Sequence, residues 1–155
     1  MKKLLIIHNK YRITGGEDIV VEQETKVLEK NFIVNSLIFS NKVSLSLKKL
    51  PLFFSSRNNE SRDKLTKVIN QFNPDIALVH NTWFNASLSI FDTLKEKNIK
   101  TILKLHNFRY FCTKTFSAKK HLRGDKFCKA CGMENVNFLN INKYFKESII
   151  KSLMI

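Results

Sequence analysis

Short runs of mainly apolar residues alternate along this 155-residue chain with longer segments of mixed polarity. Apolar runs of about 4–8 residues, rich in β-branched and aromatic side chains, are typical of strands in a protein core. Such runs occupy residues 4–8, 32–39, 75–80 and 101–105. We therefore expect four strands, of which the first is buried.

The segments between these runs repeat their apolar residues at helical spacing. In the segment 17–30, Val20 and Val21 recur two turns later as Val27 and Leu28, which predicts one apolar helix face. Further stripes are Leu65, Val68, Ile69 and Phe72 in a helix over 61–72; Phe84, Leu88, Phe91 and Leu94 after the third strand; and Ile141, Phe145, Ile149 and Leu153 in a helix over 140–154.

Strands that alternate with helices predict right-handed βαβ units, and hence an α/β, Rossmann-like parallel sheet with helices on both faces. The length fits a single domain over 1–155. In open sheets of this kind, ligands bind at the carboxyl ends of the strands. Three expected strands end in a histidine–asparagine pair: His8–Asn9, His80–Asn81 and His106–Asn107.

A single histidine at a strand end is more often a structural hydrogen-bonding group than part of a site. Three histidines at equivalent positions favour a site, because the carboxyl ends of parallel strands meet at one edge of the sheet. We expect the three pairs to face the same cleft as the double glycine that follows the first strand.

Gly15 and Gly16 open the first expected helix and are followed by Glu17 and Asp18. Backbone N–H groups at a helix start are unpaired, and glycine lets a phosphate or sugar approach them without a Cβ in the way. The sequence matches neither the dinucleotide fingerprint nor a P-loop. The two carboxylates suit the helix dipole and would repel a phosphate lying against them. A ligand-binding loop and a tight turn capped by acidic residues both stay open.

Trp83 and Arg109 follow the third and fourth expected strands. Trp83 can stack on a sugar face, although covering the core or its rim is the commoner role for such a residue. The planar fork of Arg109 can neutralise a phosphate, and its alternative role is an ion pair with Glu17 or Asp18.

Cys128 and Cys131 form one C-x-x-C pair, which resembles half of a zinc site, and Cys112 and His121 are the remaining ligand candidates. The spacing is loose, and one such pair is a weaker sign than two. The expectation is therefore reduced thiols, with no metal and no cofactor.

The net charge of +14 favours a polyanion or an anionic membrane surface as a neighbour. An AT-rich coding sequence is the alternative explanation, because it enriches Lys, Asn, Ile and Phe together. The basic residues are spread along the chain, so nucleic-acid binding is not expected. No apolar run approaches the ~20 residues of a membrane span, and the first one is too short for a signal peptide. We expect a cytoplasmic protein with peripheral contact to the inner face of the membrane.

Four stretches, taken together and in order, resemble the N-terminal half of a bacterial glycosyltransferase of family 4, which has the GT-B fold. They are HNKYRITGGEDIVVEQE from His8, PDIALVHNTW from Pro74, TILKLHNFRYFC from Thr101 and CKACG from Cys128. The resemblance covers essentially the whole chain and is to the branch that makes capsule, exopolysaccharide or lipopolysaccharide sugars.

The resemblance implies retaining transfer of a sugar from a nucleotide-sugar donor to a polysaccharide or lipid-linked acceptor, with this domain on the acceptor side and no metal required. His106 would be the catalytic residue and would contact the donor sugar near its reacting carbon. Gly15 and Gly16 would approach the donor diphosphate and the acceptor. The other substrate-binding candidates are Glu17, His80, Asn81, Trp83, Asn107 and Arg109.

The resemblance also implies that a chain ending at Ile155 lacks the last strands of this domain and the whole donor-binding domain. We therefore expect a truncated product, or one half of a split enzyme that is inactive without a separate C-terminal half. The alternative is a non-catalytic remnant of such an enzyme that binds a glycan or a partner.

Overall fold

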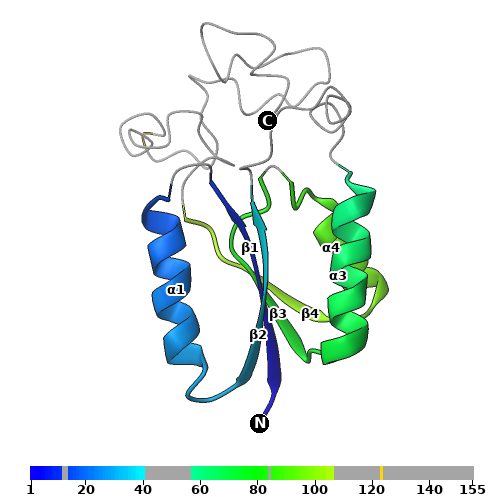
Figure 1. The fold of residues 1–155 in the computed structure, drawn as a ribbon, viewed down its shortest axis with the longest axis horizontal. Helices are drawn as coiled ribbons and strands as arrows, with labels where there is room; N and C mark the ends of the chain where they lie inside the picture. The colour runs from blue at the N-terminus through cyan, green and yellow to red at the C-terminus, as the bar shows by residue number, and fades with distance from the viewer. Residues whose placement is uncertain (12–13, 41–56, 84, 107–122, 124–155) are drawn as a thin grey trace, which may run out of the picture. The chain divides into compact units, whose positions relative to one another are not determined.

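The structure is a computed structural model that describes residues 1–11, 14–40, 57–83, 85–106 and residue 123 (Figure 1). The chain divides into two compact units, Met1–Leu105 and His106–Ile155. In the second unit the described residues are His106 and Arg123. The fold described below is that of the first unit.

Parallel strands in the order β2-β1-β3-β4 form the sheet of the first unit (Figure 1). The strands are β1 (Lys3–Lys10), β2 (Ile33–Ser40), β3 (Ile76–Val79) and β4 (Lys100–Leu103). Each overlaps one of the four predicted strands. The register places Ile7 of β1 beside both Leu37 of β2 and Val79 of β3, and Val79 beside Leu103 of β4. The expected Rossmann-like parallel sheet is confirmed.

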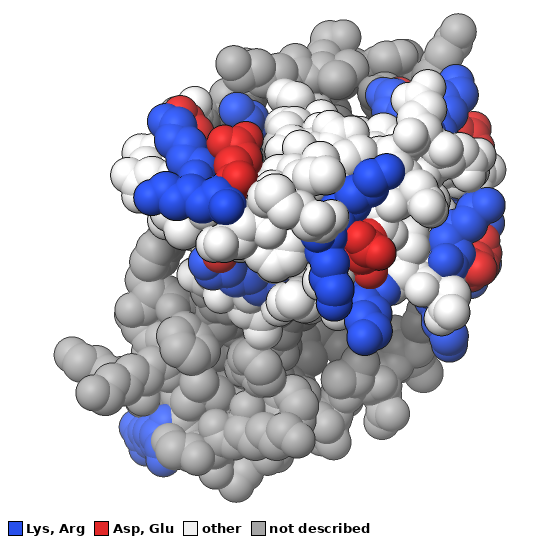
Figure 2. Space-filling view, turned by 90° about the horizontal axis from the view of Figure 1, so that it is seen from below, with Lys and Arg blue, Asp and Glu red and all other residues white. Residues whose placement is uncertain are grey.

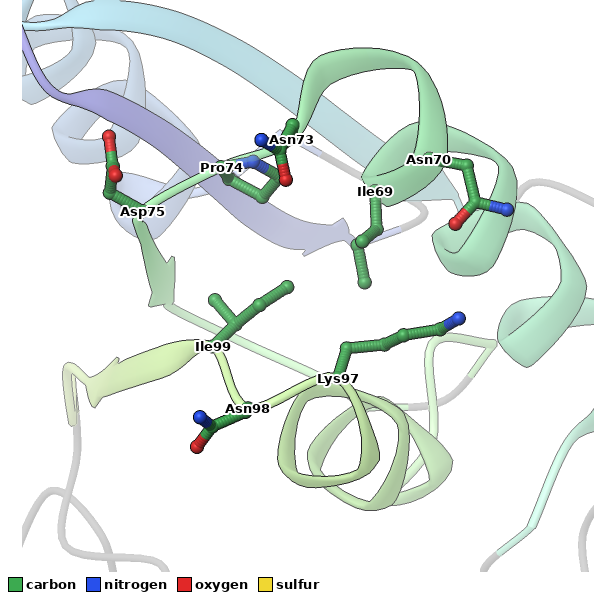
Figure 3. Close-up of a pocket in the computed structure, with 8 residues that line it drawn as sticks. All are labelled: Ile69, Asn70, Asn73, Pro74, Asp75, Lys97, Asn98 and Ile99. Atoms are coloured by element: carbon green, nitrogen blue, oxygen red, sulfur yellow. The ribbon is translucent and has the colours of Figure 1, made fainter.

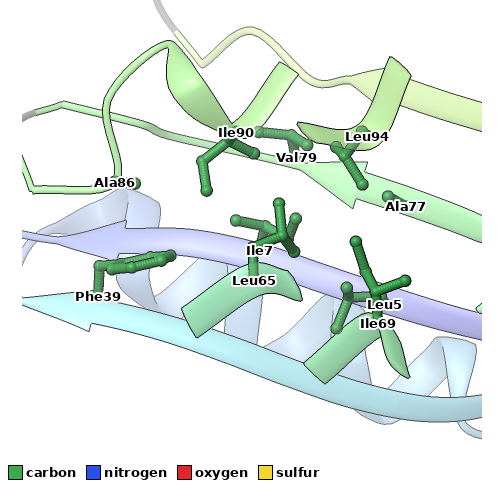
Figure 4. Close-up of a cluster of buried hydrophobic side chains, with 10 residues drawn as sticks. All are labelled: Leu5, Ile7, Phe39, Leu65, Ile69, Ala77, Val79, Ala86, Ile90 and Leu94. Atoms are coloured by element: carbon green, nitrogen blue, oxygen red, sulfur yellow. The ribbon is translucent and has the colours of Figure 1, made fainter. Parts of the chain in front are cut away.

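Helices cover both faces of this sheet. The helix α1 (Gly16–Leu28) lies on one face, and α3 (Asn59–Phe72) and α4 (Ser89–Glu96) lie on the other (Figure 1). The larger core cluster, on the α3–α4 side, contains Leu5, Ile7, Phe39, Leu65, Ile69, Ala77, Val79, Ala86, Ile90 and Leu94 (Figure 4). The smaller cluster, under α1, contains Leu4, Ile6, Val21 and Leu78. Alternate residues of β1 therefore serve opposite faces, as strand geometry requires.

The predicted apolar face of α1 is only half right. Val21 is buried and Leu28 is partly buried, but Val20 and Val27 are 39% and 59% exposed. Because an α-helix has 3.6 residues per turn, neighbours such as Val20 and Val21 point in different directions, and only one of the two stripes can face the sheet. The buried face runs through Asp18, Val21 and Leu28.

The stripe predicted for the helix over 61–72 is confirmed in α3. Leu65 and Ile69 are buried in the core, and Val68 and Phe72 pack against it. The helix starts two residues earlier than predicted, because the side chain of Asn58 accepts a hydrogen bond from the Glu60 N–H at 3.0 Å and caps the first turn.

The stripe predicted after β3 needs a correction. The helix α4 begins at Ser89, so Leu88 precedes it and is 50% exposed. Leu94 of the predicted stripe is buried together with Ile90, one turn earlier, and the predicted Phe91 packs against the same core. Phe84 lies outside the described residues, as does the helix predicted over 140–154.

Basic side chains on the face shown in Figure 2 form separate groups, most of them beside an acidic side chain. Exposed ion pairs of the first unit include Lys26–Glu22, Lys64–Glu60 and Arg62–Glu96, with nitrogen–oxygen distances of 3.2, 2.7 and 2.9 Å. This distribution differs from the continuous basic stripe that is typical of nucleic-acid-binding surfaces.

Candidate functional site

The direction in which the chain winds across the sheet changes between β1 and β3. From β1 the chain passes over the α1 face to β2, and from β2 it returns over the opposite face through α3 to β3 (Figure 1). At such a switch point, the loops that leave neighbouring strands go to opposite faces, and ligands bind in the crevice at the carboxyl ends. The residues that follow β1 and β3 are therefore the candidates for a site.

His8 and His80 lie side by side at this point. The backbone N–H of His80 donates to the Ile7 carbonyl at 2.9 Å, which continues the pairing of β1 with β3 beyond the last residue of β3. The two imidazole rings meet edge to face, with centroids 6.1 Å apart and an interplanar angle of 84°. The structure thus brings together two of the three predicted strand-end histidines.

Both of these imidazoles are buried under α1. The exposed fractions of His8 and His80 are 0% and 5%. The Nε2 atom of His8 lies 2.8 Å from Oδ1 of Asp18, and Nε2 of His80 lies 3.8 Å from Oε2 of Glu24. These two histidines therefore line the interface between α1 and the sheet, and not the open cleft that we expected. A substrate-binding role for His80 stays a prediction.

Lys104 extends the row of polar side chains to the next strand. Its backbone N–H donates to the Val79 carbonyl at 2.9 Å, and its ammonium nitrogen lies 2.7 Å from Oε2 of Glu24. Glu24 is therefore placed between an ammonium group and the His80 imidazole. His8, His80 and Lys104 come from three neighbouring strand ends, and all three meet carboxylates of α1.

Asp18 joins the end of β1 to the double glycine. Its Oδ2 atom accepts the Gly15 N–H at 2.8 Å, while its Oδ1 atom meets Nε2 of His8. Burial alone would raise the pKa of Asp18, but the Gly15 N–H and His8 outweigh it and hold the pKa below its usual value. With the carboxylate ionised, the shared hydrogen belongs to Nε2 of His8. The Nδ1 atom of His8 is buried and has no hydrogen-bond partner among the residues that the structure describes.

Gly15 and Gly16 are not required by crowding or by backbone conformation. Gly15 caps α1 in an extended conformation, with φ at −118°, and Gly16 is the first helical residue. A Cβ at either position would meet no described atom within 4 Å. Within the described part of the chain, the N–H of Gly16 has no hydrogen-bond partner. Open space beside both glycines fits a ligand-binding loop, and the Asp18 carboxylate that accepts the Gly15 N–H is the acidic cap of the tight-turn alternative, so both interpretations stay open.

Asn9 and Asn81 hold the two strand ends together. The N–H of Asn9 donates to the Asn81 carbonyl at 2.8 Å, and Nδ2 of Asn81 donates to the Asn9 carbonyl at 3.1 Å. The Oδ1 atom of Asn9 accepts the Ala86 N–H at 3.1 Å, and that of Asn81 accepts the Trp83 N–H at 3.0 Å. These amides shape the loop after β3 and place the half-buried Trp83 at the switch point.

A second polar network, which the sequence did not lead us to expect, fixes the same loop to α3. The N–H of Asn58 donates to Oγ of Ser89 at 2.7 Å, and its Nδ2 donates to the Asn85 carbonyl at 2.6 Å. Ser87 adopts a left-handed conformation, with φ at 58°, and its hydroxyl donates to Oγ of Ser89 at 3.0 Å. The loop that carries Trp83 is therefore held at several points.

A hollow of about 230 Å³ opens at the carboxyl end of β2, where its lining includes Ser40, Asn58, Glu60, Lys64 and Asn85. A larger hollow, of about 680 Å³, lies at the amino ends of β3 and β4 (Figure 3). It is lined by Ile69, Asn70, Asn73, Pro74, Asp75, Lys97, Asn98 and Ile99. The smaller hollow, and not the larger one, lies at the edge where open parallel sheets bind ligands.

The remaining predicted site residues lie in the second unit. His106 is half-buried there, and its gathering with His8 and His80 stays a prediction. Asn107, Arg109, Cys112, His121, Cys128 and Cys131 lie outside the described residues. Within the described ranges, no group of three or more His, Cys, Asp or Glu side chains is arranged to hold a metal. The same part of the chain contains no helix with the length and apolar character needed to cross a membrane.

The pairing of Asp18 with His8, and of Glu24 with His80 and Lys104, was not predicted from the sequence. The alternation of side chains along a strand could have indicated part of this arrangement. His8 lies two residues after Ile6, and His80 two residues after Leu78, so both point to the face that α1 covers.

No protein-family model, no curated protein and no solved structure matches the chain. A function is therefore assigned from its residues and their geometry.

Proposed function

We propose that the chain is the acceptor-side domain of a retaining glycosyltransferase, which transfers a sugar from a nucleotide-sugar donor to a polysaccharide or lipid-linked acceptor in cell-surface glycan synthesis. One observation supports this proposal most strongly. The double glycine, the pairs His8–Asn9 and His80–Asn81, and Trp83 come from distant parts of the sequence and lie at the switch point of a parallel sheet. Open parallel sheets bind their ligands, nucleotides among them, at such a point.

Two groups at this edge have a task in the proposal. The N–H of Gly16 and the positive end of the α1 dipole suit the diphosphate of the donor. Trp83, held by Asn81, offers an aromatic surface to a sugar ring. His106 belongs to the second unit, and the family resemblance gives it the contact with the donor sugar near the reacting carbon. Catalysis then consists of orienting the substrates and stabilising the leaving diphosphate, without a metal.

The proposal also assigns a partner and a location. A separate C-terminal half holds the nucleotide of the donor. The complex works at the inner face of the cell membrane, where anionic lipids attract a chain with a net charge of +14.

A non-catalytic module that binds a glycan or a protein partner is the second candidate. The burial of His8 and His80 favours it, because neither imidazole is open to a substrate. Exposed apolar side chains in and just after β4, an outer strand of the sheet among the described residues, favour it too: Ile102, Leu103 and Leu105 are 54%, 43% and 44% exposed. Apolar edge strands are surfaces on which another chain can pair.

Sugar transfer by the chain together with a C-terminal half tests the first proposal. The chain is co-expressed with candidate donor-binding domains, and transfer is measured from labelled nucleotide-sugars to extracted lipid-linked acceptors. We expect transfer that His106→Ala abolishes and that Arg123→Ala, a change at an exposed residue of the same unit, leaves intact. The circular dichroism spectrum should be the same for all three proteins.

Normal turnover by the His106→Ala protein would remove that residue from the mechanism. Absence of turnover with every donor and acceptor, alongside retained glycan binding, would favour the non-catalytic module.

A further inference from the structure

The loop between β3 and α4 carries Trp83 and is tied to other elements by hydrogen bonds. Connections between elements usually run over the surface and are more mobile than the elements they join. Here the Ala86 N–H donates to Oδ1 of Asn9 on β1 at 3.1 Å, in a buried contact. The Ser87 N–H donates to the Thr82 carbonyl at 2.8 Å and closes the loop. Trp83 lies inside this closed segment, so its position depends on the groups that fix the loop.

Asn58, the cap of α3, fixes the same loop from the side of another helix. Its Nδ2 donates to the Asn85 carbonyl at 2.6 Å, and its backbone N–H donates to Oγ of Ser89 at 2.7 Å. Its Oδ1 accepts the Glu60 N–H at 3.0 Å. Asn58 and Ser89 are 6% and 0% exposed. One buried amide therefore caps the helix through its oxygen and holds the loop through its nitrogen.

The backbone of Ser87 indicates that the loop is held in a conformation that it would not adopt alone. Its φ of 58° lies in the left-handed region, where a residue other than glycine persists only if its surroundings hold it. Such conformations cluster at functional sites. This loop follows β3 at the carboxyl edge of the sheet, where ligands of open parallel sheets bind. The held conformation is therefore found at the edge where a ligand would need it.

We propose that Asn58 is a positioning residue for carbohydrate binding: through the Asn85 carbonyl it fixes the loop, so that the indole of Trp83 can stack on a sugar ring. This inference rests on the proposed function and deepens it, because it names a residue outside the motifs that suggested the site. A surface that is already ordered loses less freedom when it binds its ligand, and the ligand binds more tightly for that reason. Asn58 acts through Trp83.

Two substitutions separate this role of Asn58 from its role as a helix cap. Aspartate and serine are both favourable cap residues with an oxygen for the Glu60 N–H, but neither has an amide donor for the Asn85 carbonyl. Aspartate keeps the size of asparagine and serine keeps its neutrality, so the test does not depend on one variant alone. Thr93→Val is the control, because it removes a buried hydrogen bond from α4, from Oγ1 to the Ser89 carbonyl at 2.9 Å, and keeps the side-chain shape.

Calorimetry of the full chain with sugar-containing probes provides the test. The probes are UDP-glucose, UDP-N-acetylglucosamine, GDP-mannose, dTDP-rhamnose, maltotetraose and chitotetraose, at a temperature where circular dichroism shows every variant folded. For the probes that bind the wild type, we expect Asn58→Asp and Asn58→Ser to raise the Kd about tenfold and Thr93→Val to change it less than about twofold. A residue that only stabilises the fold would lower the unfolding temperature and leave the Kd of the folded protein unchanged.

Two further readouts show whether Asn58 acts through the indole. Asn58→Ser, added to Trp83→Ala, should raise the Kd by less than about twofold beyond the single Trp83→Ala change, because the surface that it positions is already absent. In the free protein, acrylamide quenching of Trp83, the single tryptophan of the chain, should change in both Asn58 variants and stay the same in Thr93→Val.

Each outcome decides between the claims. Probe binding that Trp83→Ala weakens and the Asn58 variants do not would overturn the positioning role and leave the proposed function standing. The role is equally overturned by unchanged quenching in the Asn58 variants, by an equal loss of affinity in Thr93→Val, or by a full effect of Asn58→Ser in the Trp83→Ala protein. A wild type that binds no probe, or that Trp83→Ala does not weaken, would overturn the proposed sugar surface and this inference with it.

Discussion

The imidazole of His8 meets the imidazole of His80 edge to face under α1, with ring centroids 6.1 Å apart. The contact follows from the register, because Ile7 pairs with Val79 and the next residue of each segment turns to the same face. Each ring in turn meets a carboxylate of α1. The attachment of α1 to the sheet therefore combines a small apolar cluster with a buried row of polar groups, and its stability depends on both.

Asp18→Ala is expected to lower the free energy of unfolding by about 3 kcal/mol, because it leaves a buried donor on His8 and a half-buried donor on Gly15 without an acceptor. His8→Leu leaves the carboxylate unpaired on one side and is also destabilising. The double variant should cost about 1–2 kcal/mol less than the sum of the two, since the side chains are in direct contact. Urea denaturation at neutral pH, followed by circular dichroism, measures all three.

Glu22→Ala is the control for this cycle. Its exposed pair with Lys26 should contribute less than about 0.5 kcal/mol. If the double variant loses as much unfolding free energy as His8→Leu and Asp18→Ala together, the buried contact does not couple the strand to the helix.

Stability should also fall at acid pH in a way that depends on Asp18. Burial works to raise the pKa of Asp18, but the Gly15 N–H and His8 outweigh it, so the pKa in the folded protein lies below the unfolded value of about 3.9. The unfolded chain therefore binds more protons at acid pH. The stabilisation is complete above the unfolded value and is lost as the pH falls through the lowered folded value.

We expect the difference in unfolding free energy between the wild type and Asp18→Asn to shrink as the pH falls from about 5 to about 3. Denaturation curves at a series of pH values measure it. A difference that stays constant over this range would mean that the Asp18 carboxylate gains nothing on folding.

The packing of α1 predicts unequal costs for two valine substitutions on one helix. Val21→Ala should lower the free energy of unfolding by about 2 kcal/mol, because Val21 is 5% exposed and belongs to the cluster under α1. Val27→Ala removes the same atoms from a side chain that is 59% exposed and should change it by less than about 0.5 kcal/mol. Equal costs, measured by thermal or urea unfolding, would place α1 in a different rotation about its axis.

The strands were predictable from the sequence because their mainly apolar runs are short and are bounded by polar residues. The buried face of α1 was not predictable from the sequence. Val20 with Val27, and Val21 with Leu28, form two apolar stripes with the same spacing, and the sequence does not indicate which of them faces the sheet. Val21 and Leu28 lie inward because Asp18, on their side of the helix, meets His8. A rule that assigns acidic residues to the surface cannot foresee this, because the partner lies on another element.

The position of the strand-end histidines was likewise predictable from the sequence, but the exposure of their side chains was not. A histidine at a strand end must lie at the carboxyl edge of the sheet, and His8 and His80 do so as neighbours. Whether such a residue faces solvent depends on which helix covers its face, and that depends on packing between elements far apart in the sequence. The same limit applies to Lys104, whose partner Glu24 lies on α1.

The central claim, that a carbohydrate ligand binds at the carboxyl edge between β1 and β3, is tested most directly by the fluorescence of Trp83, the single tryptophan of the chain. The chain is titrated with nucleotide-sugars and with cell-surface glycans, and calorimetry measures the same affinities for the wild type, Trp83→Phe and Trp83→Ala. We predict a saturable change in emission, affinity kept in Trp83→Phe and affinity weakened about tenfold in Trp83→Ala. A ligand that binds all three proteins equally without changing the emission, or a panel in which no ligand binds, would contradict the claim.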